Sequence, residues 1–247
     1  MGRRVRFVVP FVALSLAVGP VAPSAARPGS ERAGGAIRAI PAPEACHGCW
    51  SPGRKVSWQW QLAKPPAAAR LIDVKMYDVD GFEASKKLVG KMHGRGIKAV
   101  CYLSAGSWEN WRPDASDFPT LVLGRSNGWP GEKWLDIRRL DIVGPIMKAR
   151  IDMCAAKGFD AVEFDNVDGY QNHTGFPLGA RQQLRYDAFL ANQAHTRGLS
   201  ALLKNDLDQV VKLLPYFDGA LNEQCFQYKE CAKLTPFVNA GKPVFGV

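Results

Sequence analysis

Strand-like and helix-like segments alternate from residue 56 to the end of the sequence, and this alternation limits the possible folds more than any other feature. Several helix-like segments stop at glycines, Gly94, Gly158 and Gly198, as helices commonly do. Such an alternation is typical of βα units around a parallel sheet. The expected strands are Val56–Gln61, Leu71–Tyr77, Ile97–Leu103, Phe159–Phe164, Ala201–Lys204, Phe217–Leu221 and Pro243–Val247. The expected helices are Phe82–His93, Leu140–Lys157, Arg181–Thr196 and Asp208–Leu213.

Polar or acidic residues follow most of the expected strands. In a (β/α)8 barrel the active site lies at the C-terminal ends of the strands, so charges that recur there indicate a site. Capping of the following helices is the alternative, and it accounts for Asp206 or Asp208 but not for every strand end. The residues in question are Asp78, Asp80, Ser104, Asp165, Asp168, Asn205, Asp206, Asn222 and Glu223.

The pattern contains seven strands, whereas a closed barrel of this class has eight. An open edge leaves unpaired backbone groups and promotes aggregation, so either a strand escapes the pattern or the chain stops early. The last expected strand ends at Val247, with the sequence. We expect an α/β fold, a TIM-like (β/α)8 barrel truncated after its seventh strand.

The N-terminal residues have the features of a secretory signal. Three arginines within the first six residues precede an apolar stretch, and small residues lead to Ala26, after which we expect cleavage. Residues 27–45 are rich in Ala, Pro, Gly and Arg and read as a flexible leader before a barrel domain at 46–247. No later segment is long and apolar enough to cross a membrane. These features predict a secreted or extracytoplasmic protein without a transmembrane anchor.

The six cysteines are expected to be oxidised, because thiols outside the cytosol tend to form disulfides. The first two form a CHGC motif that also suits a redox site or half of a zinc site. No second CxxC or histidine pair completes a metal shell, so a local disulfide is favoured. The sequence does not fix the connectivity, and the conceivable pairs are Cys46–Cys49, Cys101–Cys154 and Cys225–Cys231.

The chain is basic, with a formal net charge of +9 that falls to +6 when the three signal arginines are removed. A basic surface permits nucleic-acid binding, but the Lys and Arg residues are scattered without a run or stripe. We therefore expect no nucleic-acid partner. Attraction to an anionic cell envelope or simple solubility explains the charge, and no particular oligomeric state is indicated.

An apolar run that ends in carboxylates, GFDAVEFDNVDGY, begins at residue 158. In a strand, alternate residues share a face, so Glu163 and Asp165 lie on one face and Val162 and Phe164 on the other. If the apolar face packs on helices, Glu163 lies inside the barrel and Asp165 at its mouth. Asp168 is expected in the following loop.

A second carboxylate, Glu223, follows the expected strand Phe217–Leu221. The ends of the fourth and sixth strands can face each other across the mouth of a barrel. Asp165 and Glu223 therefore suit the pair that a glycosidase uses, one as nucleophile or base and the other as protonated acid. A structural hydrogen-bonding role for both is the alternative.

Tryptophans favour a sugar as ligand, because sugar rings stack on indole faces, although tryptophan is also a common core residue. All seven lie within the first 134 residues, and we expect two or three at the site. The segment 106–135 is rich in Gly, Pro, Asn and Trp and is too long for an ordinary βα connection, which favours a function. The tryptophans near expected strand ends are Trp58, Trp60, Trp108, Trp111, Trp129 and Trp134.

Other chemistries lack their motifs. The four histidines form no HxH or HExxH, so the usual ligands of a barrel metallohydrolase are missing. The segment 165–169 is superficially similar to a calcium loop, but its acidic spacing and terminal residue are wrong. Neither a GxSxG elbow nor a phosphate-binding glycine loop occurs. We expect no metal and no cofactor.

Seven short motifs follow one another along the chain: SWQWQL at 57–62, YDVD at 77–80, CYLSAG at 101–106, WLD at 134–136, EFDNVD at 163–168, LKND at 203–206 and NEQC at 222–225. In this order they resemble glycoside hydrolase family 114, typified by endo-α-1,4-polygalactosaminidases. The resemblance runs from about residue 48 to the end. It implies a TIM-like barrel that cleaves α-1,4-linked galactosamine-containing polysaccharide with retention, with Asp165 as nucleophile and Glu223 as acid/base.

Unacetylated galactosamine is cationic, so a pocket lined by Asp78, Asp80, Asp168 and Asp206 would attract it although the protein is basic. Lys204 is awkward beside a cationic sugar, and we favour its pairing with a pocket carboxylate. The residues expected to bind substrate are Trp58, Asp78, Asp80, Tyr102, Trp108, Trp134, Asp168, Tyr170, Lys204, Asn205 and Asp206.

Two other readings remain open from the sequence. In the first reading, the chain is a non-catalytic carbohydrate-binding protein with a degenerate or truncated barrel, and it binds polysaccharide without releasing product. Alternatively, it is an envelope protein whose carboxylates are structural, in which case it neither binds nor hydrolyses polysaccharide.

Overall fold

The structure, a computed structural model, describes residues 39–247. The expected signal peptide, residues 1–26, lies outside the described residues, as does the expected leader up to residue 38. No helix within the described part is long and apolar enough to span a membrane.

The segment just before the barrel is fixed by hydrogen bonds to a helix. The Asn192 amide donates to the Ala42 carbonyl at 2.7 Å and accepts from the Glu44 backbone N–H at 2.9 Å. These contacts lie before residue 46, the expected start of the barrel domain, so the packed region begins earlier than that boundary.

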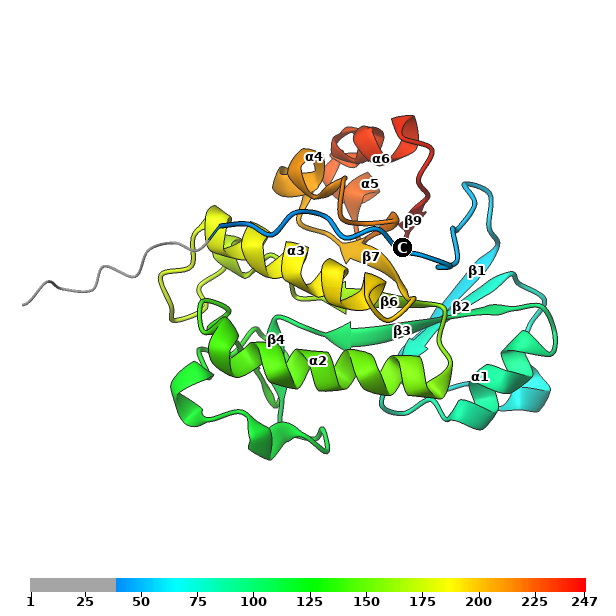
Figure 1. The fold of residues 1–247 in the computed structure, drawn as a ribbon, viewed down its shortest axis with the longest axis horizontal. Coiled ribbons are helices and arrows are strands. Elements are labelled where there is room, and N and C mark those ends of the chain that lie inside the picture. Colours follow the sequence, from blue (N-terminus) through cyan, green and yellow to red (C-terminus); the bar gives the residue numbers. More distant parts are fainter. Residues whose placement is uncertain (1–38) are drawn as a thin grey trace, which may run out of the picture. The chain divides into compact units, whose positions relative to one another are not determined.

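Seven parallel strands form the central sheet (Figure 1). They are β1 (Trp58–Gln61), β2 (Met76–Asp80), β3 (Lys98–Ser104), β6 (Ala161–Asp165), β7 (Ser200–Lys204), β8 (Gly219–Asn222) and β9 (Val244–Gly246). Each strand pairs with the next of these along the chain. This confirms the TIM-like barrel architecture, with seven strands in the described residues where a closed barrel has eight.

Helices follow the strands and cover the outer face of the sheet, with α2 and α3 side by side (Figure 1). The α-helices are α1 (Lys86–His93), α2 (Leu140–Lys157), α3 (Ala180–His195), α4 (Val210–Leu213), α5 (Cys225–Tyr228) and α6 (Thr235–Asn239). The short 3-10 helices are Ala68–Arg70, Ala115–Asp117, Thr120–Val122, Gly169–Gln171, Leu207–Gln209 and Cys231–Leu234.

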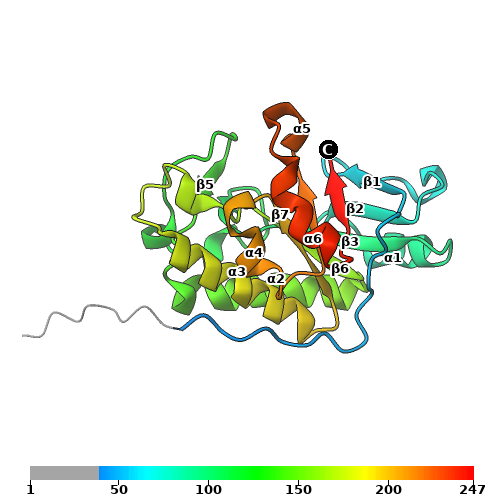
Figure 2. The same cartoon turned by 90° about the horizontal axis from the view of Figure 1, so that it is seen from above.

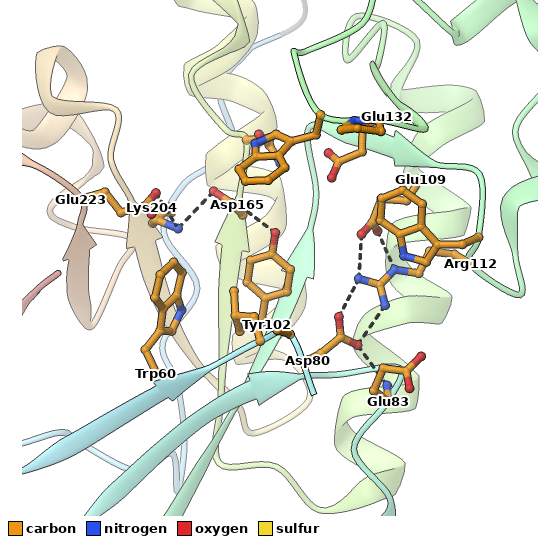
Figure 3. Close-up of a pocket in the computed structure, with 16 residues that line it drawn as sticks. Trp60, Asp80, Glu83, Tyr102, Glu109, Arg112, Glu132, Asp165, Lys204 and Glu223 are labelled. Atoms are coloured by element: carbon orange, nitrogen blue, oxygen red, sulfur yellow. Dashed lines mark hydrogen bonds and ion pairs between the residues drawn. The ribbon is translucent and has the colours of Figure 1, made fainter. Parts of the chain in front are cut away.

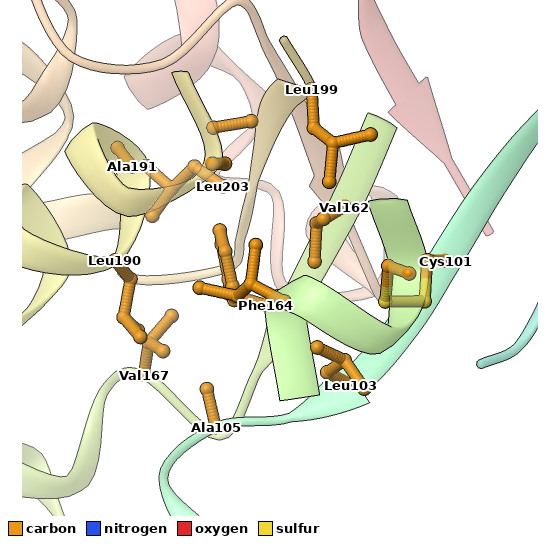
Figure 4. Packing of buried hydrophobic residues seen from close by; sticks show 14 of the residues in the cluster. Cys101, Leu103, Ala105, Val162, Phe164, Val167, Leu190, Ala191, Leu199 and Leu203 are labelled. Atoms are coloured by element: carbon orange, nitrogen blue, oxygen red, sulfur yellow. A yellow bond between two sulfur atoms is a disulfide. The ribbon is translucent and has the colours of Figure 1, made fainter. Parts of the chain in front are cut away.

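The two faces of the sheet build different interiors. On the outer face, Val162 and Phe164 are buried among apolar helix residues (Figure 4), as the alternation in this strand predicts. On the inner face, an apolar layer lies beneath a polar one. In the apolar layer, the rings of Trp58 on β1 and Phe245 on β9 lie 5.1 Å apart, so the first and last strands of the sheet meet across the interior (Figure 2). The other members of the apolar layer are Met76, Val100, Ala161, Leu202 and Leu221.

A small antiparallel sheet, β4 (Ser107–Glu109) with β5 (Glu132–Trp134), lies in the segment 106–135, where no strand is predicted. Gly106 leads into it and permits a close approach, because a Cβ there would stand 1.6 Å from the Asn166 carbonyl oxygen. This two-stranded sheet therefore anchors the long segment against the mouth of the barrel, directly beside the end of β6.

Three disulfides are present, and they are the three conceivable pairs. Cys46–Cys49 and Cys225–Cys231 close short loops, whereas Cys101–Cys154 ties β3 to α2 across 53 residues. The long bridge limits the unfolded chain most, since the stabilisation grows with the length of the closed loop.

Candidate active site

A cavity of about 730 Å³ opens at the C-terminal ends of the strands (Figure 3). This is where barrel enzymes carry their sites. Its lining from the strands and strand ends is Trp60, Asp80, Tyr102, Asp165, Lys204 and Glu223. The lining residues contributed by loops and by the β4–β5 sheet include Glu83, Glu109, Trp111, Arg112, Trp129, Glu132 and Asn166.

Lys204 lies at the centre of the polar layer and joins three carboxylates. Its Nζ is 2.9 Å from Glu163 Oε1 and 3.3 Å from both Asp165 Oδ1 and Glu223 Oε2. Burial disfavours the charge, but the three carboxylates outweigh burial and raise the pKa of Lys204 above its ordinary value. The ammonium group is therefore permanent, and the predicted pairing of Lys204 with a pocket carboxylate is confirmed.

Asp165 is held at both of its carboxylate oxygens. Tyr102 Oη donates to Oδ2 at 2.8 Å, and Lys204 donates to Oδ1. Burial, followed by the charge of Asp165, raises the pKa of Tyr102 well above its usual value, so the phenol stays a donor. Two donors orient Asp165 as an anion facing the cavity, while Glu223, with 36% of its side chain exposed, is the less constrained of the two carboxylates.

Sharp backbone turns follow the three central residues of the site. Asn166, Asn205 and Gln224 come directly after Asp165, Lys204 and Glu223 and have φ of 60°, 53° and 68°. Non-glycine residues rarely adopt this left-handed region, and such strain gathers at functional sites. The backbone thus changes direction directly after each of these three side chains.

The other wall of the cavity is built around Arg112 (Figure 3). Its guanidinium forms two bonds to Asp80, at 2.9 and 2.6 Å, and two to Glu109, at 2.8 and 2.6 Å. Burial raises the pKa of Glu109 although Arg112 opposes the rise. In total the lining carries six carboxyl groups against two cationic groups, so it favours a cationic ligand.

A second cavity of about 190 Å³ lies beyond Glu223, which lines both. Asp168, Asn205 and Asp206 line it. Burial raises the pKa of Asp206 to about 7, and Tyr170 donates to its Oδ1 at 2.9 Å. Within residues 39–247 the remaining oxygen of Asp206 accepts from no donor, and the fully buried Asp187 lies beside it, so we expect the two carboxyls to share a proton.

We predict that the raised pKa of Asp206 makes the fold less stable as pH rises. Folded Asp206 keeps its proton up to a pKa of about 7, whereas the unfolded side chain loses it near 3.8. Between these values the folded state binds more protons, so its stability falls with increasing pH. Asp206→Asn should lose less stability than the wild type over this range when Tm is measured at successive pH values. The exposed Asp73→Asn should follow the wild-type slope, and an equal slope for Asp206→Asn would contradict a raised pKa of Asp206.

The predicted binding residues are distributed over four places. Asp80, Tyr102 and Lys204 line the main cavity with the two predicted catalytic residues, and Asp168, Asn205 and Asp206 line the second. Asp78 is fully buried below the main cavity. The remaining four lie outside the lining of both cavities: Trp58, Trp108, Trp134 and Tyr170.

The tryptophans that do line the main cavity are Trp60, Trp111 and Trp129, which agrees in number with the two or three expected there. Trp108 instead donates its indole N–H to the Ala115 carbonyl at 3.0 Å, beneath the loop. Sequence reasoning missed four charged residues, Glu83, Glu109, Arg112 and Glu132. Three of them lie in the long segment already singled out for function, which is the signal that could have found them.

A family model matches residues 40–247, and the family is described as glycoside-hydrolase family GH114. Among solved structures, the chain is similar to Ega3 of Aspergillus fumigatus in complex with galactosamine. The identity is 40%, the match covers 82% of this chain and 80% of that one, and the TM-score is 0.78.

Two more distant relatives match as well. The glycoside hydrolase domain of PelA from Pseudomonas aeruginosa is 14% identical with a TM-score of 0.61, covering 76% of this chain and 81% of that one, and shares the fold. An uncharacterized protein of Deinococcus radiodurans is 25% identical over 205 residues, which is 72% of this chain. The match spans 64% of the length of that relative.

Proposed function

The chain belongs to glycoside-hydrolase family GH114, and we propose that it is a secreted, endo-acting, retaining enzyme that cleaves α-1,4-linked galactosamine-containing polysaccharide. One observation carries the proposal: Asp165 and Glu223 lie on either side of the Lys204 ammonium, in a cavity rich in carboxylates.

In the proposed mechanism, Asp165 attacks the anomeric carbon while Glu223 protonates the departing glycosidic oxygen. The covalent glycosyl–enzyme is then hydrolysed by a water that Glu223 activates as a base. Tyr102 and Lys204 support the role of Asp165, because both stabilise its anion. One Nζ lies 3.3 Å from an oxygen of each carboxylate, so those oxygens are separated by at most twice that distance. Such a short span favours retention.

Charge and shape support the substrate. The carboxylates in the main cavity suit the ammonium groups of galactosamine, which is the ligand in the solved structure that is 40% identical. Glu223 separates two cavities, so a polymer can occupy binding positions on both sides of the bond to be cleaved. This favours endo action. Secretion is supported by the N-terminal sequence and by three disulfides.

The substrate is tested by incubating the purified chain with α-1,4-galactosamine oligomers, with their N-acetylated counterparts and with β-1,4-glucosamine oligomers. We expect shorter oligomers, identified by mass, from the first set, with cleavage at internal bonds. Binding of these oligomers without product would favour the non-catalytic carbohydrate-binding protein. Cleavage of the acetylated set alone would contradict the role given to the cavity carboxylates.

We predict that Trp111→Ala weakens substrate binding more than turnover. Trp111 lines the main cavity with 51% of its surface exposed, so the exposed part of its ring can stack on a sugar. Loss of roughly 1 kcal/mol of stacking should raise KM about fivefold, with little change in kcat. Leu121→Ala, similarly exposed but outside the lining, serves as the control in the same kinetic measurement. An unchanged KM for Trp111→Ala would remove this residue from the binding surface.

A further inference from the structure

Asp78 on β2 is fully buried one layer below the main cavity, where a lone carboxylate would be costly. No donor within the described part of the chain forms a hydrogen bond to either of its oxygens. Asp80, two residues further along the same face, reaches the cavity instead and pairs with Arg112. The two aspartates therefore share a face of the strand but have different surroundings.

The neighbour of Asp78 is Glu163 on β6, which lies within hydrogen-bonding reach. Both Glu163 oxygens already accept: Oε1 from Lys204 at 2.9 Å and Oε2 from the Trp60 indole at 3.2 Å. Two carboxyl groups form a hydrogen bond only when one of them carries a proton. With Glu163 fixed as the acceptor of two donors, the proton belongs to Asp78.

The surrounding charges agree with a neutral Asp78. Burial, followed by the charge of Glu163, raises the pKa of Asp78 well above its usual range. The titratable groups that face it are Glu163 and Asp165 on β6 and Lys204 on β7. Among these Lys204 carries the positive charge, and its three donor directions already serve three carboxylates. A fourth negative charge would have no compensation.

We infer that Asp78 is a positioning residue, a neutral carboxyl that donates to Glu163 and thereby fixes Lys204 between Asp165 and Glu223. Without this donor, Lys204 and Trp60 alone hold Glu163, so its carboxylate is less constrained beside Lys204. The ammonium then moves toward the two site carboxylates, and their separation changes. The effect on turnover rests on the proposed function, whereas the protonation of Asp78 does not.

The kinetic test compares Asp78→Asn, which keeps a neutral donor, with Asp78→Leu, which has similar size and no donor. On α-1,4-galactosamine oligomers we expect Asp78→Asn to stay within about threefold of the wild-type kcat. Asp78→Leu should lose about a hundredfold in kcat with KM nearly unchanged, because small misplacements of reacting groups have effects of this size. An equal loss in both variants, or none in Asp78→Leu, would overturn the inference.

A second test needs no substrate and decides the case even if Asp78→Leu fails to fold. A carboxyl whose folded pKa is raised makes the fold less stable as pH rises from about 4, because the folded state then binds an extra proton. Asp78→Asn does not undergo this loss of stability. The difference in Tm between Asp78→Asn and the wild type should therefore rise by about 2–4 °C or more between pH 4 and pH 8. The exposed Asp73→Asn should show a constant difference. A constant difference for Asp78→Asn would mean that Asp78 is ionised, and the inference would be wrong.

Discussion

Asp165→Asn is expected to lower kcat by about 10⁴-fold or more, because an amide cannot attack the anomeric carbon and the remaining site supplies only residual catalysis. The substitution preserves shape, and the amide oxygen can still accept from Tyr102, so folding should change little. The rate of new reducing ends on α-1,4-galactosamine oligomers measures the effect. Asp117→Asn, on the exposed surface, is the matched control and should keep the wild-type rate. Undiminished turnover by Asp165→Asn would mean that another residue is the nucleophile.

Glu223→Gln separates the two carboxylate roles. We expect a loss of about 10²–10⁴-fold, the usual contribution of a general acid. The loss of glycosylation rate should be smaller on substrates with good leaving groups, because these need little protonation. Asp165→Asn should be equally impaired on both kinds of substrate. If the two variants responded alike to the leaving group, the assignment of acid and nucleophile would fail.

Lys204→Met is expected to lower the free energy of unfolding by about 3–5 kcal/mol, since removing one partner of a buried ion pair leaves an uncompensated charge. The affected carboxylate is Glu163, which has no exposed surface and is 2.9 Å from the lysine Nζ. Urea denaturation of the two proteins gives the difference. Lys212→Met, an exposed lysine on α4, should change stability by well under 1 kcal/mol. A similarly small effect at Lys204 would mean that Glu163 does not depend on this cation.

Several regular elements of the fold could be predicted, because at these places the local signals agree with the packing. The helix expected at Leu140–Lys157 has these bounds in the structure, and Gly158, with φ of 87°, ends it. The alternation around Glu163 predicted which residues face the helices and which face the barrel. In this strand, the alternation of residues in the sequence corresponds to the two faces of the strand in the structure.

The layer at which a side chain sits could not be predicted in the same way. Asp78 and Asp80 share a face of β2, and period-two alternation treats them alike, but one is sealed beneath the cavity and the other lines it. The pairing of Arg112 with Asp80 is also invisible in the sequence, because it joins residues 32 positions apart through an irregular loop. The depth of a side chain below the cavity and its pairing with a distant residue depend on how the strands and loops pack in three dimensions.

The most direct test of the enzymatic account is the anomeric configuration of the sugar first released, followed by proton NMR during cleavage of α-1,4-galactosamine oligomers by the wild-type chain. Retention through Asp165 predicts that the new reducing end appears first as the α-anomer and reaches the equilibrium mixture later by mutarotation. A β-anomer as the first product would contradict a nucleophilic Asp165. Absence of any new reducing end from these oligomers would contradict the proposed activity itself.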